Sequence, residues 1–400
     1  SGPISLGGSP VGESINLELG VSATATASMD SALFRTLANV ASGAISLNNF
    51  YGKASFTATG LIGGGYTGSA RTATIDKIAI ATAANATSFG NLATAVDAVS
   101  GLASSTRGIF AGGNGNSAVQ NAINYVTIAT NGNSTSFGTL NYSRYYSSAA
   151  SNNVRGIVAG GGTGSPTGEI DYITIASTGN AVDWGQAGGG LGTSVTEASA
   201  SANDTRMIVF SGSATTLLQT LIIASAGVSS NFGNLDNRIT GTASVASGTR
   251  ALVAGGYSNT LGAHQSQIWY VTIASSGTAT AFGNLLSTYN GFAGCASDVR
   301  GVFAGGFSSG SYMNTIQYVT IASTGNAISF GTLTTNKQAT GACSNAAQAV
   351  GPFATSSAMA LFAGGFATRR IASIQYVNVD TTGNSKQFGD LSLFTSSVGS

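Results

Sequence analysis

Few side chains in this sequence have the chemistry that acid–base or nucleophilic catalysis requires. His264 is the one histidine in 400 residues, so a Ser-His-Asp or Cys-His site would have to use it. Glu169 and Asp171 are near one another, but the other acidic residues are dispersed, whereas glycoside hydrolysis needs two facing carboxylates. We therefore interpret His264 as a loop residue and predict no catalytic residue and no enzyme activity.

The two cysteines, Cys295 and Cys343, are equally poor material for a metal or redox site. A metal centre normally combines several His, Cys or carboxylate ligands. Both cysteines occupy the same place in neighbouring copies of a repeat, in a stretch of small residues. We interpret them as small buried hydrophobic residues, and the sequence predicts no metal and no cofactor.

The composition argues against several classes of partner. Charged residues make up 7% of the chain and the net charge is +1, whereas nucleic-acid binding relies on clustered Lys and Arg. No apolar run is long enough to span a bilayer. The first residues also lack the basic and apolar segments of a signal peptide. We therefore expect no nucleic-acid partner, no membrane insertion and synthesis in a reducing host cytoplasm.

An internal repeat must position whatever site exists. An aromatic residue that is followed by glycine recurs at intervals of 47 to 50 residues, with a last interval of 58. Its members are Phe89, Phe137, Trp184, Phe232, Phe282, Phe330 and Phe388. Four short strands fit each unit, for example residues 294–297, 300–306, 316–321 and 328–333. Units of this length with four antiparallel strands are typical of propeller blades.

The repeat also resembles a known family. A hydrophobic run is followed by Gly-Gly, then by a Tyr and then by the aromatic residue, as in the kelch repeat. The Gly-Gly pairs are Gly64–Gly65, Gly112–Gly113, Gly160–Gly161, Gly255–Gly256, Gly305–Gly306 and Gly364–Gly365. The tyrosines are Tyr125, Tyr172, Tyr270, Tyr318 and Tyr376. The fourth unit departs from the pattern with Ser211-Gly212 and Thr220, and the first unit has Lys77 in the Tyr position.

We therefore expect an all-β fold, a seven-bladed kelch-like β-propeller over residues 56–400. Residues 392–398 match the first-strand segment of the other units, and no eighth unit follows to use them. We expect this C-terminal strand to pair into the first blade and to close the ring, because closure leaves no open sheet edge.

Residues 1–55 do not repeat and are expected to form a short module of mainly helical character. Val11, Ile15 and Leu19 recur every four residues, which favours an amphipathic helix. Arg35 with Leu37-Ala38, and the run Ile-Ser-Leu-Asn-Asn-Phe-Tyr-Gly-Lys at 45–53, resemble a module at the front of tailed-phage virion proteins. This resemblance implies a bacteriophage structural protein that is anchored to other virion proteins through residues 1–55 and located in the virion.

Five arginines share one repeat position. They are Arg107, Arg155, Arg206, Arg250 and Arg300. One interpretation is a ring of anion-binding charges. The interpretation we favour is structural, with each guanidinium group bonding carbonyl oxygens between blades.

Loops between the second and third strands, and connections between blades, vary from unit to unit and are expected to share one face. Variable loops on a rigid scaffold are where binding tends to occur, and Tyr with Ser or Asn suits a neutral glycan or a protein. The alternative is that these loops are merely solvated. The candidates are Tyr142, Arg144, Tyr145, Tyr146, Tyr257, His264, Tyr289, Phe292, Phe307, Tyr312, Arg369 and Arg370.

Three functions fit these observations. The first is a non-enzymatic virion protein of the tail, baseplate or fibre that recognises a host-surface glycan or protein. The second is a capsid decoration or tail cement protein with purely structural contacts. The third, and weakest, is a polysaccharide-cleaving enzyme. The sequence leaves the position in the virion, the receptor and homo-oligomer formation open.

Overall fold

The computed structural model describes residues 58–184, 190–212 and 215–345 in full, and the backbone of three further strands between 359 and 395. The expected helical module at 1–55 lies outside these described residues. Every element in the described part is a β-strand, so the all-β expectation is confirmed. No helix among the described residues is long and apolar enough to cross a membrane.

Residues 58–345 form six four-stranded antiparallel sheets, which we number in chain order. Sheet 1 contains β1 (Thr59–Gly63), β2 (Thr74–Ala79), β3 (Thr87–Asn91) and β31 (Gly341–Ser344). Sheet 2 contains β5 (Ser100–Ala103), β6 (Arg107–Ala111), β8 (Ala122–Thr127) and β9 (Thr135–Thr139). Sheet 3 contains β10 (Ser148–Ser151), β11 (Arg155–Ala159), β12 (Ile170–Thr174) and β13 (Val182–Asp183).

The other three sheets repeat this order. Sheet 4 contains β14 (Ser199–Ala202), β15 (Arg206–Gly212), β16 (Thr215–Ile222) and β17 (Ser230–Asn234). Sheet 5 contains β19 (Ala243–Ala246), β20 (Arg250–Ala254), β23 (Gln267–Thr272) and β24 (Thr280–Asn284). Sheet 6 contains β25 (Ala293–Ala296), β26 (Arg300–Ala304), β29 (Thr315–Thr320) and β30 (Ile328–Thr332). The four strands predicted for each unit are thus confirmed in sheets 2 to 6, and sheet 1 also has four strands, with β31 as its first.

The first strands of the six sheets surround a small central space. Each contacts the next in the order β5, β10, β14, β19, β25 and β31, and β31 contacts β5 again. They line a cavity of about 70 Å³ with Gly, Ala and Ser side chains and a few larger ones. Small residues at this position allow six strands to approach one axis closely.

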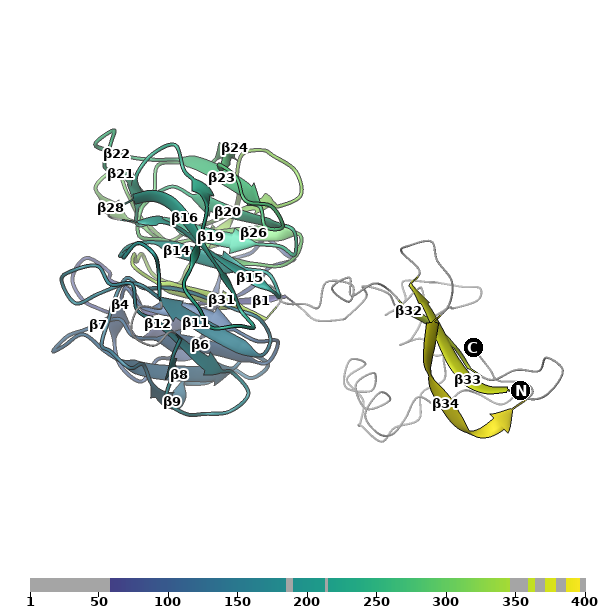
Figure 1. The fold of residues 1–400 in the computed structure, drawn as a ribbon. Coiled ribbons are helices and arrows are strands. Elements are labelled where there is room, and N and C mark those ends of the chain that lie inside the picture. The colour runs from purple at the N-terminus through teal and green to yellow at the C-terminus, as the bar shows by residue number, and fades with distance from the viewer. Residues whose placement is uncertain are drawn as a thin grey trace, which may run out of the picture. The chain divides into compact units, whose positions relative to one another are not determined.

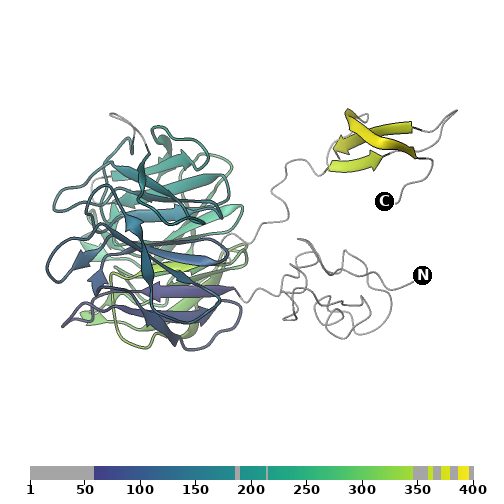
Figure 2. The ribbon, with the colours of Figure 1, turned by 90° about the horizontal axis from the view of Figure 1, so that it is seen from below.

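The edge of the first sheet is paired differently from our expectation. β31 pairs antiparallel with β1, from Gly60 opposite Ser344 to Gly63 opposite Gly341, and Figures 1 and 2 show the two strands side by side. The predicted closure by residues 392–398 is therefore wrong, since Gly341–Ser344 occupies that edge. In the other units a tight turn joins the first strand to the second, whereas after β31 the next strand begins only at Met359. This longer connection frees β31 to pair with β1.

A cycle of six backbone hydrogen bonds joins the connections between sheets. Each connection contributes one residue to this cycle. Its N–H donates to the carbonyl oxygen of the member in the preceding connection, and its own carbonyl oxygen accepts from the N–H of the member in the following connection. The residues are Ala98, Tyr146, Glu197, Gly241, Gly291 and Ala339, and the N–H of Ala98 returns to the carbonyl of Ala339 at 2.7 Å. All six have a positive φ, between 50° and 65°. The cycle has six members and ties the last connection to the first.

The apolar core is divided among the sheet interfaces. Six buried clusters each combine side chains of two neighbouring sheets, and one of them joins Ile62 and Ile78 of sheet 1 to Val302 and Phe330 of sheet 6. The glycine after each aromatic residue serves the same packing. A Cβ on Gly138 would lie 2.1 Å from the carbonyl oxygen of Gly179 in the next sheet, so a side chain there would separate the sheets.

The seventh repeat forms a unit of its own. Its strands β32 (Met359–Ala363), β33 (Ile371–Asn378) and β34 (Lys386–Thr395) make a three-stranded antiparallel sheet, and the chain divides into two compact units between these strands and the six sheets. The prediction of seven blades in one ring is therefore not confirmed.

Candidate functional site

The variable loops are built as small sheets of their own. In sheet 5 the loop after β20 forms a hairpin of β21 (Tyr257–Ser258) and β22 (Ala263–His264), and β21 pairs with β18 (Ile239–Thr240) of the preceding connection. The same arrangement joins β4 (Val96–Asp97) to β7 (Asn114–Gly115). Loop and connection therefore share one face, as expected, and backbone hydrogen bonds hold them in fixed positions.

The Gly-Gly pairs make this arrangement possible. Gly305 has a φ of 72° and Gly306 a φ of 101°, and a Cβ on Gly305 would lie 2.7 Å from the carbonyl oxygen of Lys337. Gly112 and Gly113 adopt the same conformation with φ of 66° and 103°. Only glycine combines these angles with so close an approach, and the residue that follows the pair begins the loop hairpin.

Five aromatic side chains on this face contact one another in a row, which we call the aromatic ladder. It consists of Tyr257, His264, Phe307, Tyr312 and Tyr66, in this order. Successive ring centroids are 5.2, 6.3, 5.3 and 5.8 Å apart. All five side chains are partly exposed. The ladder crosses the loops of sheets 5, 6 and 1.

Backbone pairing places four of the five aromatic residues opposite one another in two hairpins. Tyr257 lies opposite His264 in the hairpin of sheet 5, and Phe307 lies opposite Tyr312 in β27 (Phe307–Ser308) and β28 (Ser311–Tyr312) of sheet 6. Phe307 also bridges to Asn290, and Tyr66 bridges to Gln338. The rings therefore stand on paired backbone.

Sequence reasoning predicted four members of the ladder and missed Tyr66. A signal was available, because Tyr66 follows Gly64–Gly65 as Tyr257 follows Gly255–Gly256 and Phe307 follows Gly305–Gly306.

Three of the predicted binding residues are buried instead. Arg144 is 1% exposed, Tyr289 3% and Phe292 5%. Tyr289 and Phe292 pack in the cluster between sheets 5 and 6. The assignment of these three residues to a binding surface is wrong, because a connection between sheets must also cover the core beneath it.

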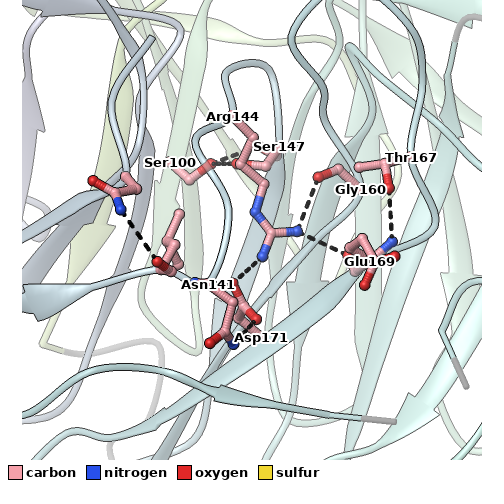
Figure 3. A network of polar contacts seen from close by, with 10 residues as sticks. Ser100, Asn141, Arg144, Ser147, Gly160, Thr167, Glu169 and Asp171 are labelled. Atoms are coloured by element: carbon pink, nitrogen blue, oxygen red, sulfur yellow. Dashed lines mark hydrogen bonds and ion pairs between the residues drawn. The ribbon is translucent and has the colours of Figure 1, made fainter. Parts of the chain in front are cut away.

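Arg144 is the centre of a buried polar network (Figure 3). Its guanidinium group forms an ion pair with Asp171, which is 2% exposed, and donates to the carbonyl oxygens of Glu169 at 2.9 Å and Gly160 at 3.3 Å. Asp171 also accepts from the side-chain amide of Asn141 at 2.6 Å. The network ties the connection after sheet 2 to the third strand of sheet 3, so Asp171 has a structural partner.

A second buried ion pair lies where the connection between β30 and β31 meets sheet 1. This pair was not predicted from the sequence. Lys337 is 0% exposed and its Nζ lies 2.8 Å from Oδ2 of Asp76. Asp76 also accepts from the hydroxyl of Thr334. Burial lowers the pKa of Lys337, and the Asp76 carboxylate opposes that shift. Asp76 and Asp171 occupy the same strand position, directly after the buried Ile75 and Ile170, which was the available signal.

The remaining candidates do not join the ladder. Tyr145 and Tyr146 contact each other at 5.2 Å between ring centroids, and Tyr142 is 56% exposed. Burial, with Glu197 and Asp97 nearby, raises the pKa of Tyr146 to about 12. Arg369 and Arg370 lie outside the described residues.

The repeated arginines bond between sheets. Arg107 donates to the carbonyl of Ile175 at 2.9 Å, and Arg155 to that of Ile223 at 2.8 Å. Arg206 and Arg250 continue the pattern, and Arg300 reaches the carbonyl of Ala81 in sheet 1 at 2.7 Å. Four of them also lie 4.5 to 4.7 Å from a tyrosine ring centroid of their own sheet. These contacts match the structural interpretation of the arginines, in which each guanidinium group bonds carbonyl oxygens of the neighbouring sheet.

The two cysteines lie in first strands and face the packing between sheets. Cys295 is 6% exposed and Cys343 5%, and a Cβ on Gly60 would lie 2.6 Å from the Cys295 sulfur. Burial raises the pKa of Cys295 to about 12 and also raises that of Cys343, so both thiols stay protonated at neutral pH. Within the described residues no three His, Cys, Asp or Glu side chains cluster as metal ligands would.

Comparison of the sequence with protein-family models and with curated proteins found no match.

Proposed function

We propose that residues 58–345 form a six-bladed, kelch-like β-propeller. We also propose that the chain is a non-enzymatic virion protein of a tailed bacteriophage and that it binds a host-surface glycan or protein through its loop face. Support for the propeller comes from the six sheets, the cycle of first-strand contacts and the cycle of backbone hydrogen bonds. The virion assignment rests on the resemblance of Arg35 with Leu37-Ala38, and of the run at 45–53, to a module at the front of tailed-phage virion proteins.

The aromatic ladder is the observation that carries the binding role. Five partly exposed rings in contact, on loops that are tied to the scaffold, form a pre-organised apolar surface. Tyrosine supplies contact area at low conformational-entropy cost, and rigid loops reduce the entropy that binding must overcome.

Binding to intact cells tests this proposal. We expect the purified full-length chain to bind cells of the bacterium that the phage infects and to slow adsorption of the phage itself. A chain that binds these cells no better than unrelated bacteria contradicts the receptor role and favours the structural alternative. Antibody labelling over the capsid or along the tail tube would point to the same alternative.

A further inference from the structure

The ladder has the geometry of an extended platform. Its neighbouring rings meet edge to face or at a tilt, with interplanar angles of 60° to 72°, so the row combines ring faces and ring edges. The row crosses the loops of sheets 5, 6 and 1. Such a surface suits a long ligand with repeated apolar faces better than a compact one.

The aromatic side chains of the ladder include no Asp, Glu, Lys or Arg. Two arginines lie beside it: Arg71 bridges to Tyr66 and its Nε lies 3.1 Å from the carboxylate of Asp97, and the exposed Arg238 accepts through its carbonyl oxygen from the N–H of Asn259 in the sheet 5 hairpin. The rings themselves offer a charged ligand no ionic partner, and burying an unpaired charge against them would cost free energy.

Polar groups beside the ladder have hydrogen-bonding capacity to spare. Nδ1 of His264 and Oδ1 of Asn290 are buried and lack a hydrogen-bond partner within the described residues. Both side chains flank Phe307, one by ring contact and one by backbone pairing. A hydroxyl group can donate to the Asn290 oxygen and can donate to or accept from Nδ1 of His264, so both atoms are suitable partners for a hydroxyl-rich ligand.

We infer that the ladder binds a neutral polysaccharide, with the apolar faces of successive sugar rings stacked along it. This inference rests on the proposed function and names its ligand class. A pyranose has an apolar ring face and a rim of hydroxyl groups, which matches partly exposed aromatic rings with polar neighbours. Protein interfaces are also enriched in Tyr and Phe, so a protein partner is the alternative that the test below must distinguish.

The test uses the full-length chain and polysaccharide from the envelope of the bacterium whose cells it binds. Ion exchange separates this material into a neutral and an anionic fraction, and affinity electrophoresis measures the apparent Kd for each. We compare the wild-type chain with Phe307→Ala, Tyr312→Ala and Tyr312→Phe. Ile328→Ala is the matched control, because Ile328 is an exposed apolar side chain in β30, the edge strand of sheet 6, away from the ladder. Thermal unfolding confirms that each variant is folded.

We expect the neutral fraction to bind and the two alanine variants to bind at least about tenfold more weakly, which is about 1.4 kcal/mol. Tyr312→Phe and Ile328→Ala should stay close to wild type, since the first variant keeps its aromatic ring and the second changes a residue outside the ladder. Cell binding that persists without retention by the neutral fraction overturns the glycan inference and leaves the proposed function standing. Absence of cell binding overturns both, and equal binding by folded alanine variants overturns the assignment to the ladder.

Discussion

Two junctions between sheets each contain a buried ion pair, but the basic residue differs between them. At the junction of sheets 2 and 3 the connection inserts Arg144 against Asp171, and at the junction of sheets 6 and 1 it inserts Lys337 against Asp76. The first lies within the continuous chain, whereas the second joins β31 to β1 across most of the sequence. The ion pair is therefore a property of the connection rather than of chain closure.

The two cations differ in what else they hold. The Arg144 fork bonds Asp171 and two loop carbonyls, while Nζ of Lys337 adds only the hydroxyl of Thr74 at 3.3 Å. A planar guanidinium group distributes several donors in fixed directions, whereas an ammonium group acts as a point charge. The junction with fewer directed contacts is also the one that the aromatic ladder crosses, from Tyr312 to Tyr66.

Removing either carboxylate should have the largest effect on stability. Asp171→Ala and Asp76→Ala each leave a buried cation without its partner, and we expect a loss of about 3–5 kcal/mol in the free energy of unfolding. Urea denaturation measures it. Glu169→Ala is the control, because Glu169 is exposed and only its backbone carbonyl serves Arg144. Equal losses in the control and in Asp171→Ala would contradict the buried-pair account.

The thiols should make the junction of sheets 6 and 1 sensitive to alkali. Cys343 stands in β31 where Ala150 stands in β10, and Cys295 packs in the cluster between sheets 6 and 1. Because burial raises the folded-state pKa of Cys295 from 9.0 to about 12, the unfolded chain loses its proton first. The resulting stability is present below pH 9 and is lost as the pH rises toward 12.

The double variant Cys295→Ala, Cys343→Ala checks this sign. We expect its free energy of unfolding to fall less steeply than that of wild type between pH 9 and 12. Both chains should show the same slope between pH 7 and 8, where the thiols are protonated in either state. An identical alkaline slope in the two chains would refute the assignment to the thiols.

Removing the inter-sheet arginine of sheet 6 should have a moderate effect. Arg300→Ala loses hydrogen bonds to the carbonyls of Ile80 and Ala81 across the junction with sheet 1. We expect a loss of about 1–2 kcal/mol, with a similar loss for Arg107→Ala at the junction of sheets 2 and 3. Urea denaturation measures both losses. A far larger loss for Arg300→Ala than for Arg107→Ala would show that the two junctions are not equivalent.

Deleting residues 346–400 should have the smallest effect on the six sheets. Sheet 1 is completed by β31, so we expect the truncated chain to retain its β-sheet circular dichroism and its main unfolding transition. The control deletes residues 341–400 and thereby removes β31 as well, which should lower the melting temperature. Loss of folding in the first deletion would instead support a ring that includes the seventh repeat.

The sequence went far toward the fold of each unit. Alternating β-branched residues, Gly-Gly exits and the aromatic-Gly segments predicted the strands, because these signals are local to a few residues. Residues 294–297, 300–306, 316–321 and 328–333 were expected as strands, and β25, β26, β29 and β30 lie there within one or two residues. The number of units in one ring was not predictable in this way.

The candidate site was also predictable only in part. The residues of the ladder stand out as aromatic side chains in variable loops, and the aromatic residue after Gly-Gly is readable as a pattern. That Arg144 turns inward depends on the acid that lies beneath its connection, and this acid, Asp171, is 27 residues away.

By itself, the sequence determined the four-stranded unit, its repetition and the near absence of catalytic side chains, because composition and short-range periodicity carry that information. Only the tertiary structure decided that β31 and not the C-terminal segment completes sheet 1, which connections bury a cation, and which five rings meet. These outcomes depend on pairings between segments that are far apart in the sequence, and the local pattern of each segment does not specify its partner.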